Sequence, residues 1–168
     1  MLSLFLLGYS QSTTVVISQV YGAGGNSGAT YNADYVEVHN ISVTSQSLAG
    51  LSIQYGSSAV TGAWSGVYAL PSVSIPAGGY YLIQMSGAGA VGAALPTPDA
   101  VATPAISMAA ASGRVALVTG TTPLNACPAS SAYIDFVGYG ASTCFEGSGA
   151  TGTLSATLAA FRNANGCT

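Results

Sequence analysis

A single histidine, His39, is the residue in this sequence best suited to act as a general base near neutral pH. A serine–histidine–acid triad would need a serine in a nucleophile-elbow context, and the motif G-x-S-x-G does not occur. His39 also ends an alternating run, Tyr35–His39, which is typical of a β-strand. We therefore interpret His39 as a strand residue on a sheet face, and we expect no catalytic residues.

Carboxylates are the next candidates for chemistry. Asp34 and Glu37 are close in sequence, and Asp135 and Glu146 could approach from another strand. Paired carboxyls would suit glycoside hydrolysis, and carboxylates with loop carbonyls would suit calcium. Nothing marks a cleft, so we expect no cofactor and no metal site, with calcium as the remaining alternative. The chain has two arginines and no lysine, and we expect Arg162 to form a structural ion pair with Glu37 or Asp135 across the fold.

Two further motifs have structural interpretations. Gly87–Gly92 matches the dinucleotide pattern G-x-G-x-x-G, but prolines follow where that motif needs a helix, so we interpret it as a loop. Asn40-Ile41-Ser42 fits a glycosylation sequon.

The three cysteines, Cys127, Cys144 and Cys167, lack the short spacing of a zinc site. One disulfide with one odd thiol is the expected arrangement for an exported chain. The pair Cys144–Cys167 is favoured slightly over Cys127–Cys144.

The elements that must position these residues have a period of two. Alternating or β-branched runs are separated by glycine, proline and serine clusters, at Thr14–Tyr21, Tyr35–His39, Leu51–Tyr55, Val67–Leu70, Val73–Ile75, Tyr80–Met85, Arg114–Thr119 and Tyr133–Tyr139. Only Leu154–Asn163 could form a short helix, and it could equally be a strand. Residues 87–105 predict a long surface loop. The pattern indicates one all-β domain.

Composition narrows the possible functions. Charged residues make up 4% of the chain, against about 25% in an ordinary soluble domain. Two arginines cannot neutralise a phosphate backbone, which excludes nucleic-acid binding through a basic patch. The apolar run at residues 1–7 is too short to span a membrane. With so little charge, either small polar residues solvate the surface or much of the surface lies against other molecules. Ten tyrosines could contact a glycan or a protein, although about half must belong to the core.

The segments VVISQVYGAGGNSGATYNADYVEVHN (15–40), SLAGLSIQYGS (47–57), IPAGGYYLIQMSGAGAVGAALPTPDA (75–100), SGRVALVTGTTPL (112–124) and IDFVGYGASTCFEGSGA (134–150) follow the order found in lamin-tail domains. The chain resembles the copies in bacterial secreted proteins over roughly residues 14–167. The resemblance implies an immunoglobulin-like β-sandwich that acts as a non-catalytic module at an extracellular or cell-surface location.

Two departures from this family shape our expectations. No catalytic domain accompanies the copy, and the family pattern continues beyond the NGCT motif at 165–168 with an acidic segment and a final strand. We therefore expect a sandwich over residues 13–168 that lacks its last strand, preceded by an apolar segment at residues 1–12. That segment is either a secretory signal remnant or a donor strand.

The leading functional hypothesis is self-association into a filament or surface assembly. The segment 1–12 of one subunit would add as a strand to the open edge of the next, with side chains from Leu2, Leu4 and Leu6, or from Phe5 and Leu7, filling a groove. The alternative is a binding module for a glycan, a cell-wall polymer or a partner protein.

Overall fold

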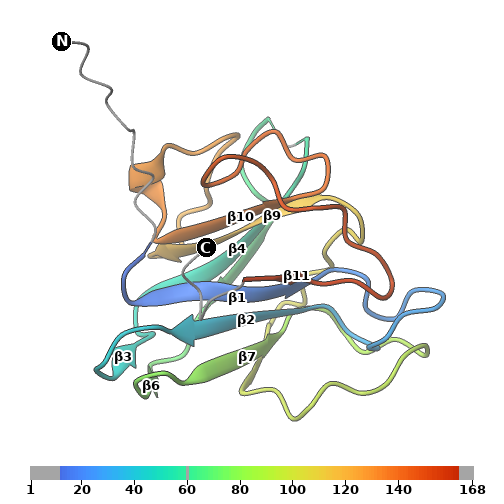
Figure 1. Ribbon diagram of the computed structural model, residues 1–168, viewed down its shortest axis with the longest axis horizontal. Helices are drawn as coiled ribbons and strands as arrows, with labels where there is room; N and C mark the ends of the chain where they lie inside the picture. The colour runs from blue at the N-terminus through green and yellow to red at the C-terminus, as the bar shows by residue number, and fades with distance from the viewer. Residues whose placement is uncertain (1–11, 60, 163–168) are drawn as a thin grey trace.

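The computed structural model describes residues 12–59 and 61–162 and forms two packed β-sheets (Figure 1). One sheet has the strand order β11-β1-β2-β7-β8 and the other has the order β10-β9-β4-β5. β3 and β6 form a separate two-stranded sheet beside the end of β2. The strands are β1 (Val15–Tyr21), β2 (Tyr35–Asn40), β3 (Gln46–Ser47), β4 (Leu51–Ser57), β5 (Gly66–Ala69), β6 (Ser74–Ile75), β7 (Tyr80–Gln84), β8 (Ala100–Val101), β9 (Gly113–Thr119), β10 (Asp135–Tyr139) and β11 (Ala160–Phe161).

The all-β sandwich expected from the sequence is confirmed. The pairings between the named strands are antiparallel except for β7 with β8, and the only helical element among the described residues is a 3-10 turn at Ser130–Ala132. No helix in the described part of the chain is long and apolar enough to cross a membrane.

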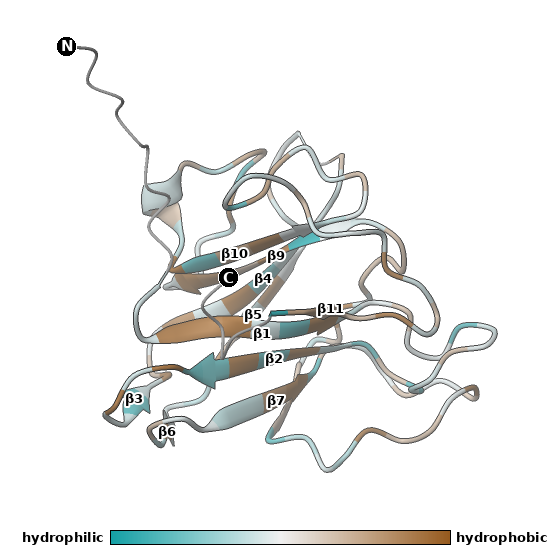
Figure 2. Cartoon of the chain, viewed as in Figure 1, coloured by the Kyte–Doolittle hydropathy of each residue, from teal (hydrophilic) through white to brown (hydrophobic). Residues whose placement is uncertain are grey.

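Alternation along each strand explains why the sheets pack together. In β2, Val36 and Val38 are fully buried, whereas Glu37 between them is only partly buried on the other face. Figure 2 shows the hydrophobic residues concentrated in the strands and paler, more polar residues in most of the connecting loops. A period of two therefore places one face of each sheet in the core.

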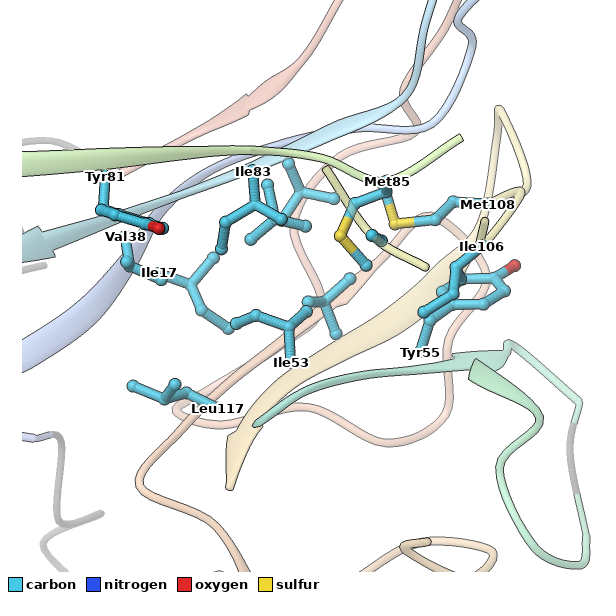
Figure 3. Close-up of a cluster of buried hydrophobic side chains, with 14 of the residues drawn as sticks. Ile17, Val38, Ile53, Tyr55, Tyr81, Ile83, Met85, Ile106, Met108 and Leu117 are labelled. Atoms are coloured by element: carbon cyan, nitrogen blue, oxygen red, sulfur yellow. The ribbon is translucent and has the colours of Figure 1, made fainter. Parts of the chain in front are cut away.

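The core lies between the two sheets (Figure 3). Ile17, Val38 and Ile83 come from the first sheet and meet Ile53 and Leu117 of the second. Ile106 and Met108, from the segment between β8 and β9, pack against Tyr55 at one end of this core. A second cluster covers the outer face of the β10-β9-β4-β5 sheet and includes Trp64, Ala116, Val118, Leu124, Phe136 and Cys144.

The structure refines the expectations for the 87–105 loop and the 154–163 stretch, and it does not describe the terminal segments. The loop at 87–105 contains a short strand, β8, which pairs in parallel with β7. The ambiguous stretch Leu154–Asn163 provides strand β11, which pairs with β1. Residues 1–11 and 163–168 lie outside the described residues, so the donor segment and the missing last strand stay predictions.

Candidate functional site

A groove opens where the two sheets meet along β10, β1 and β11. Its cavity volume is about 330 Å³, within the usual size range of small binding pockets. We refer to it as the β10–β11 groove. It is lined by Ile17, Ser18, Gln19, Val20, Phe136, Val137, Gly138, Glu146, Gly147, Ser148, Gly149, Thr151, Ala160, Phe161 and Arg162.

The groove has apolar walls and an exposed aromatic rim. Ile17, Val20 and Ala160 are buried members of the core that reach the groove from the first sheet. Val137 of β10 is partly buried and packs against the same core. Phe161 lies at the rim with 65% of its surface exposed. An apolar segment that entered this groove would contact apolar side chains that already line it.

An ion pair joins the two sheets through Arg162, which lines the groove, and Asp135, which is buried behind it. The Arg162 Nη2 group donates to both carboxylate oxygens of Asp135, at 3.0 and 2.8 Å. Asp135 belongs to β10, and Arg162 directly follows β11 in the other sheet. Asp135 is thus the partner of Arg162 among the two that the sequence suggested. Glu37 instead accepts hydrogen bonds from Ser18 Oγ and Gln19 Nε2.

The same pair stabilises a β-bulge in β1. The register of β1 against β2 shifts between Ile17 and Gln19, so Ser18 is the extra residue. Asp135 accepts the backbone N–H of Ile17 at 2.6 Å, and Arg162 Nε donates to the Ile17 carbonyl at 2.9 Å. A bulge interrupts the ladder locally, and these side chains satisfy the backbone groups beside it. Burial raises the pKa of the Asp135 carboxyl, and Arg162 and the Ile17 N–H oppose that rise.

The outer edge of β10 is covered by side-chain and loop contacts. Glu146 Oε2 accepts the backbone N–H of Phe136 at 3.0 Å. Two residues further along the strand, the Thr151 N–H donates to the Gly138 carbonyl at 2.8 Å. The Gly140 N–H in turn donates to the Thr151 carbonyl. The loop at 146–151 therefore occupies hydrogen-bonding positions that a neighbouring strand would use.

Glu146 is the titratable group in this arrangement that responds near neutral pH. Burial raises its pKa to about 7, and the negative charge of nearby Asp135 adds to the rise. The hydrogen bond from Phe136 and the positive charge of Arg162 lower it in part. The folded state therefore binds a proton at Glu146 more tightly than the unfolded chain does.

This difference predicts how stability depends on pH. Between the unfolded pKa near 4.5 and the folded pKa near 7, the folded state holds the extra proton, so the Glu146 contribution to stability falls as pH rises. We expect Glu146→Gln to remove this part of the decline. The wild type should therefore lose melting temperature relative to the variant between pH 5 and pH 8. Thermal unfolding at the two pH values measures it. An identical difference at both would contradict the assignment.

The other residues considered for chemistry lie apart from this groove. The Asp34 carboxylate accepts the backbone N–H groups of Gly24 and Met108, which ties two loops together. His39 is buried and stacks on Tyr80 with ring centroids 4.0 Å apart. Within residues 12–59 and 61–162, no three His, Cys, Asp or Glu side chains gather to hold a metal ion. The Asp135 oxygens that calcium would need already accept bonds from Arg162 and Ile17.

The disulfide joins Cys127 to Cys144, so the favoured Cys144–Cys167 pairing is wrong. The bond connects the loop after β9 with the loop after β10. Cys144 belongs to the outer cluster around Trp64 and Phe136, so the disulfide joins the two loops beside that cluster. The sequence could not select this pair because it does not show which loops fold over the same sheet face. Cys167 lies outside the described residues.

The sequon asparagine is a structural residue. Asn40 is fully buried, and its Nδ2 group donates to the carbonyls of Thr44, Ile75 and Pro76. A glycan on that nitrogen would displace these bonds, so the folded domain does not present Asn40 for glycosylation.

Sequence reasoning missed the roles of two charged residues. It paired Glu146 with Asp135 as carboxylates, but not with the β10 backbone, because a glycine- and serine-rich loop does not reveal where it folds back. Arg114 is 2% exposed and donates to the carbonyls of Ala126 and Ser58. The strand register places Arg114 between Gly56 and Gly138 of the neighbouring strands, and that register is visible only in the structure.

Comparison with known proteins gives one family. A family model described as Lamin Tail Domain matches residues 9–140, which is well over half of the chain. Comparison with curated proteins gives no match. The matched region covers strands β1 to β10 and so includes one wall of the groove.

Proposed function

Because this chain belongs to the lamin tail domain family, we propose that it is a non-catalytic β-sandwich module that assembles with other copies of itself by strand addition. The acceptor is the β10–β11 groove. The donor is the apolar segment at residues 1–12 of a neighbouring subunit. The observation that carries this proposal is the combination, in one groove, of a strand edge, apolar walls and an exposed aromatic rim.

The strand edge supplies the affinity in this mechanism. Phe136, Val137 and Gly138 of β10 line the groove, and an extended segment that displaced the 146–151 loop could pair with this edge. Main-chain hydrogen bonds are independent of the side chains of the donor, whereas alternate side chains enter pockets and give specificity. Val137, Ala160 and Phe161 would form the apolar surface for those side chains.

The donor sequence suits such a groove. Leu2, Leu4 and Leu6 would point to one face of an extended segment, and Phe5 and Leu7 would point to the other. Either set presents apolar side chains at the spacing of a strand. A contact of this kind is head-to-tail, because the donor and the acceptor are different surfaces of one subunit. Repetition without closure gives a filament.

An extracellular or cell-surface location completes the proposal. The disulfide between Cys127 and Cys144 is compatible with an oxidising compartment, as is the absence of a membrane-spanning helix among the described residues. A surface with few charges would also be favourable in a protein whose copies lie against one another.

Phe161→Asp is expected to weaken self-association at least about tenfold, because it places a carboxylate at the rim where apolar donor side chains must dock. Leu158→Asp is the matched control, since Leu158 is 58% exposed on the same segment but does not line the groove. Sedimentation velocity of the full chain over a concentration series measures both. Equal weakening by the two variants, or none by Phe161→Asp, would contradict the groove as acceptor.

The donor is tested by Leu4→Asp in the full chain. This variant should lose association to a similar extent while keeping the melting temperature of the sandwich. If Leu4→Asp associates as the wild type does, the groove binds something other than residues 1–12. Direct binding assays with cell-wall polysaccharide would then test the glycan alternative.

A further inference from the structure

We propose that residues 145–153 form an autoinhibitory strap, which covers the free edge of β10 in the single subunit and opens before a donor strand docks. The strap contains the 146–151 loop. This inference rests on the proposed function and assigns a means of regulation to the β10–β11 groove. Assembly then depends on two quantities, the affinity of the open edge for the donor and the fraction of subunits in which the strap is open.

The strap occupies hydrogen-bonding positions that an added strand needs. β10 is the terminal strand of its sheet, so a new strand can pair only with its outer edge. The Phe136 N–H donates to Glu146 Oε2 at 3.0 Å. The Thr151 N–H donates to the Gly138 carbonyl at 2.8 Å, and the Thr151 carbonyl accepts the Gly140 N–H at 3.0 Å. Residues two apart in a strand direct their backbone groups to the same side. A donor strand on this side would have to displace the strap.

Backbone contacts, rather than packing, hold the strap in place. Cys144 precedes it and is buried, with a disulfide to Cys127, and Leu154 follows it as a buried member of the core. None of residues 145–153 is buried. Opening the strap therefore costs mainly its hydrogen bonds, and segments with few buried apolar contacts open at a small part of the free energy of global unfolding. The two ends stay anchored while the middle leaves β10.

The strap also contains a glycine that its closed conformation does not require. A Cβ at Gly152 would meet no atom within 4 Å, and Gly152 does not adopt a left-handed backbone conformation. Glycine nevertheless gives the open strap more conformational freedom than another residue would. Alanine at this position should therefore shift the balance towards the closed strap, by the entropic effect through which such substitutions stabilise folded proteins.

The opening equilibrium sets the size of the effect on assembly. When the strap is closed in most free subunits, the apparent association constant is the intrinsic constant multiplied by the open fraction. A substitution that acts only on the closed or only on the open strap therefore changes association by the same factor as it changes opening.

Two strap variants should shift association in opposite directions. Gly152→Ala restricts the open strap and keeps the closed one intact, so we expect it to weaken association about two- to fivefold. Glu146→Ala removes the acceptor of the Phe136 N–H and should strengthen association about two- to tenfold, which corresponds to the net value of one hydrogen bond. Sedimentation velocity of the full chain over a concentration series measures both.

Each variant has a matched control away from the groove. Gly62→Ala is the control for Gly152→Ala, because a Cβ at Gly62 also meets no atom within 4 Å and Gly62 does not line the groove. Asp99→Ala is the control for Glu146→Ala. Asp99 is an exposed carboxylate that likewise accepts a backbone N–H, from Leu82, and it does not line the groove. Both controls should associate as the wild type does.

Hydrogen–deuterium exchange of the free and the assembled wild type shows whether the strap leaves β10. On assembly, amides of residues 135–140 should become more protected because the donor strand pairs with them. Amides of residues 146–152 should become less protected because the strap has opened. Increased protection of both segments would mean that the donor docks over a closed strap, which overturns the inference and leaves docking in the groove supported.

The association data separate the strap from the proposed function in the same way. The inference is overturned if Gly152→Ala and Glu146→Ala shift association in the same direction, or by no more than their controls do. Weakening by Phe161→Asp would in that case still support the groove as acceptor. Absence of association at every concentration overturns the inference and the proposed function together.

Discussion

Asp135→Asn is expected to lower the free energy of unfolding by about 3–5 kcal/mol, the range for breaking a buried ion pair by removing one partner. The Asp135 side chain is fully buried and binds Arg162 through both oxygens. It also accepts the Ile17 N–H next to the bulge in β1. Asparagine keeps the shape but loses the charge, so the Arg162 guanidinium loses its carboxylate partner between the sheets. Urea unfolding followed by circular dichroism measures the loss.

The matched control for this prediction is Asp99→Asn. The Asp99 carboxylate also accepts a backbone N–H, from Leu82 at 2.7 Å, but Asp99 is exposed at the opposite side of the first sheet. Its replacement should cost less than about 1.5 kcal/mol, the usual net value of one hydrogen bond. Similar losses for the two variants would show that the ion pair between the sheets contributes little.

Removing the Cys127–Cys144 disulfide is expected to cost about 3 kcal/mol. The two cysteines are 17 residues apart, and closing a loop of about 15 residues restricts the unfolded chain by roughly this amount. The double variant Cys127→Ser/Cys144→Ser is preferable to a single one, because it leaves neither partner free to pair with Cys167. Urea unfolding against the oxidised wild type provides the measurement.

The loss should match the effect of reducing the wild-type protein. It should also be accompanied by a change in the fluorescence of Trp64, because Cys144 packs in the same outer cluster. A decrease in the free energy of unfolding below about 1 kcal/mol would mean that the loops around Trp64 are stable without the disulfide.

The five carboxylates of this chain share one use in the structure. Each accepts at least one hydrogen bond from another residue of the chain. Asp34, Asp99, Asp135 and Glu146 accept backbone N–H groups, and Glu37 accepts from Ser18 and Gln19. The low charge content is therefore concentrated in structural contacts. Serine, threonine, glycine and alanine fill many of the exposed positions instead.

The sequence by itself determined the class of the fold and the strand faces. Alternation in runs such as Tyr35–His39 predicted β-strands, because the period of a strand is a local property of the backbone, and Val36 and Val38 of this run lie together in the core. The number of tyrosines led to the expectation that about half belong to the core, and Tyr21, Tyr35, Tyr55, Tyr81 and Tyr139 are buried. The shortest strands were less predictable from the sequence. β8 and β11 each have two residues, too few for a pattern to emerge.

Only the tertiary structure decided which distant groups meet. The partner of Cys144, the position of Glu146 on the β10 edge and the contacts of Arg162 at the β1 bulge depend on how loops return over a sheet. Sequence periodicity carries no information about that return, because glycine- and serine-rich loops permit many paths. The groove arises from the same cause. It forms where two sheets separate at their edges, and its walls come from residues that are more than a hundred positions apart in the chain.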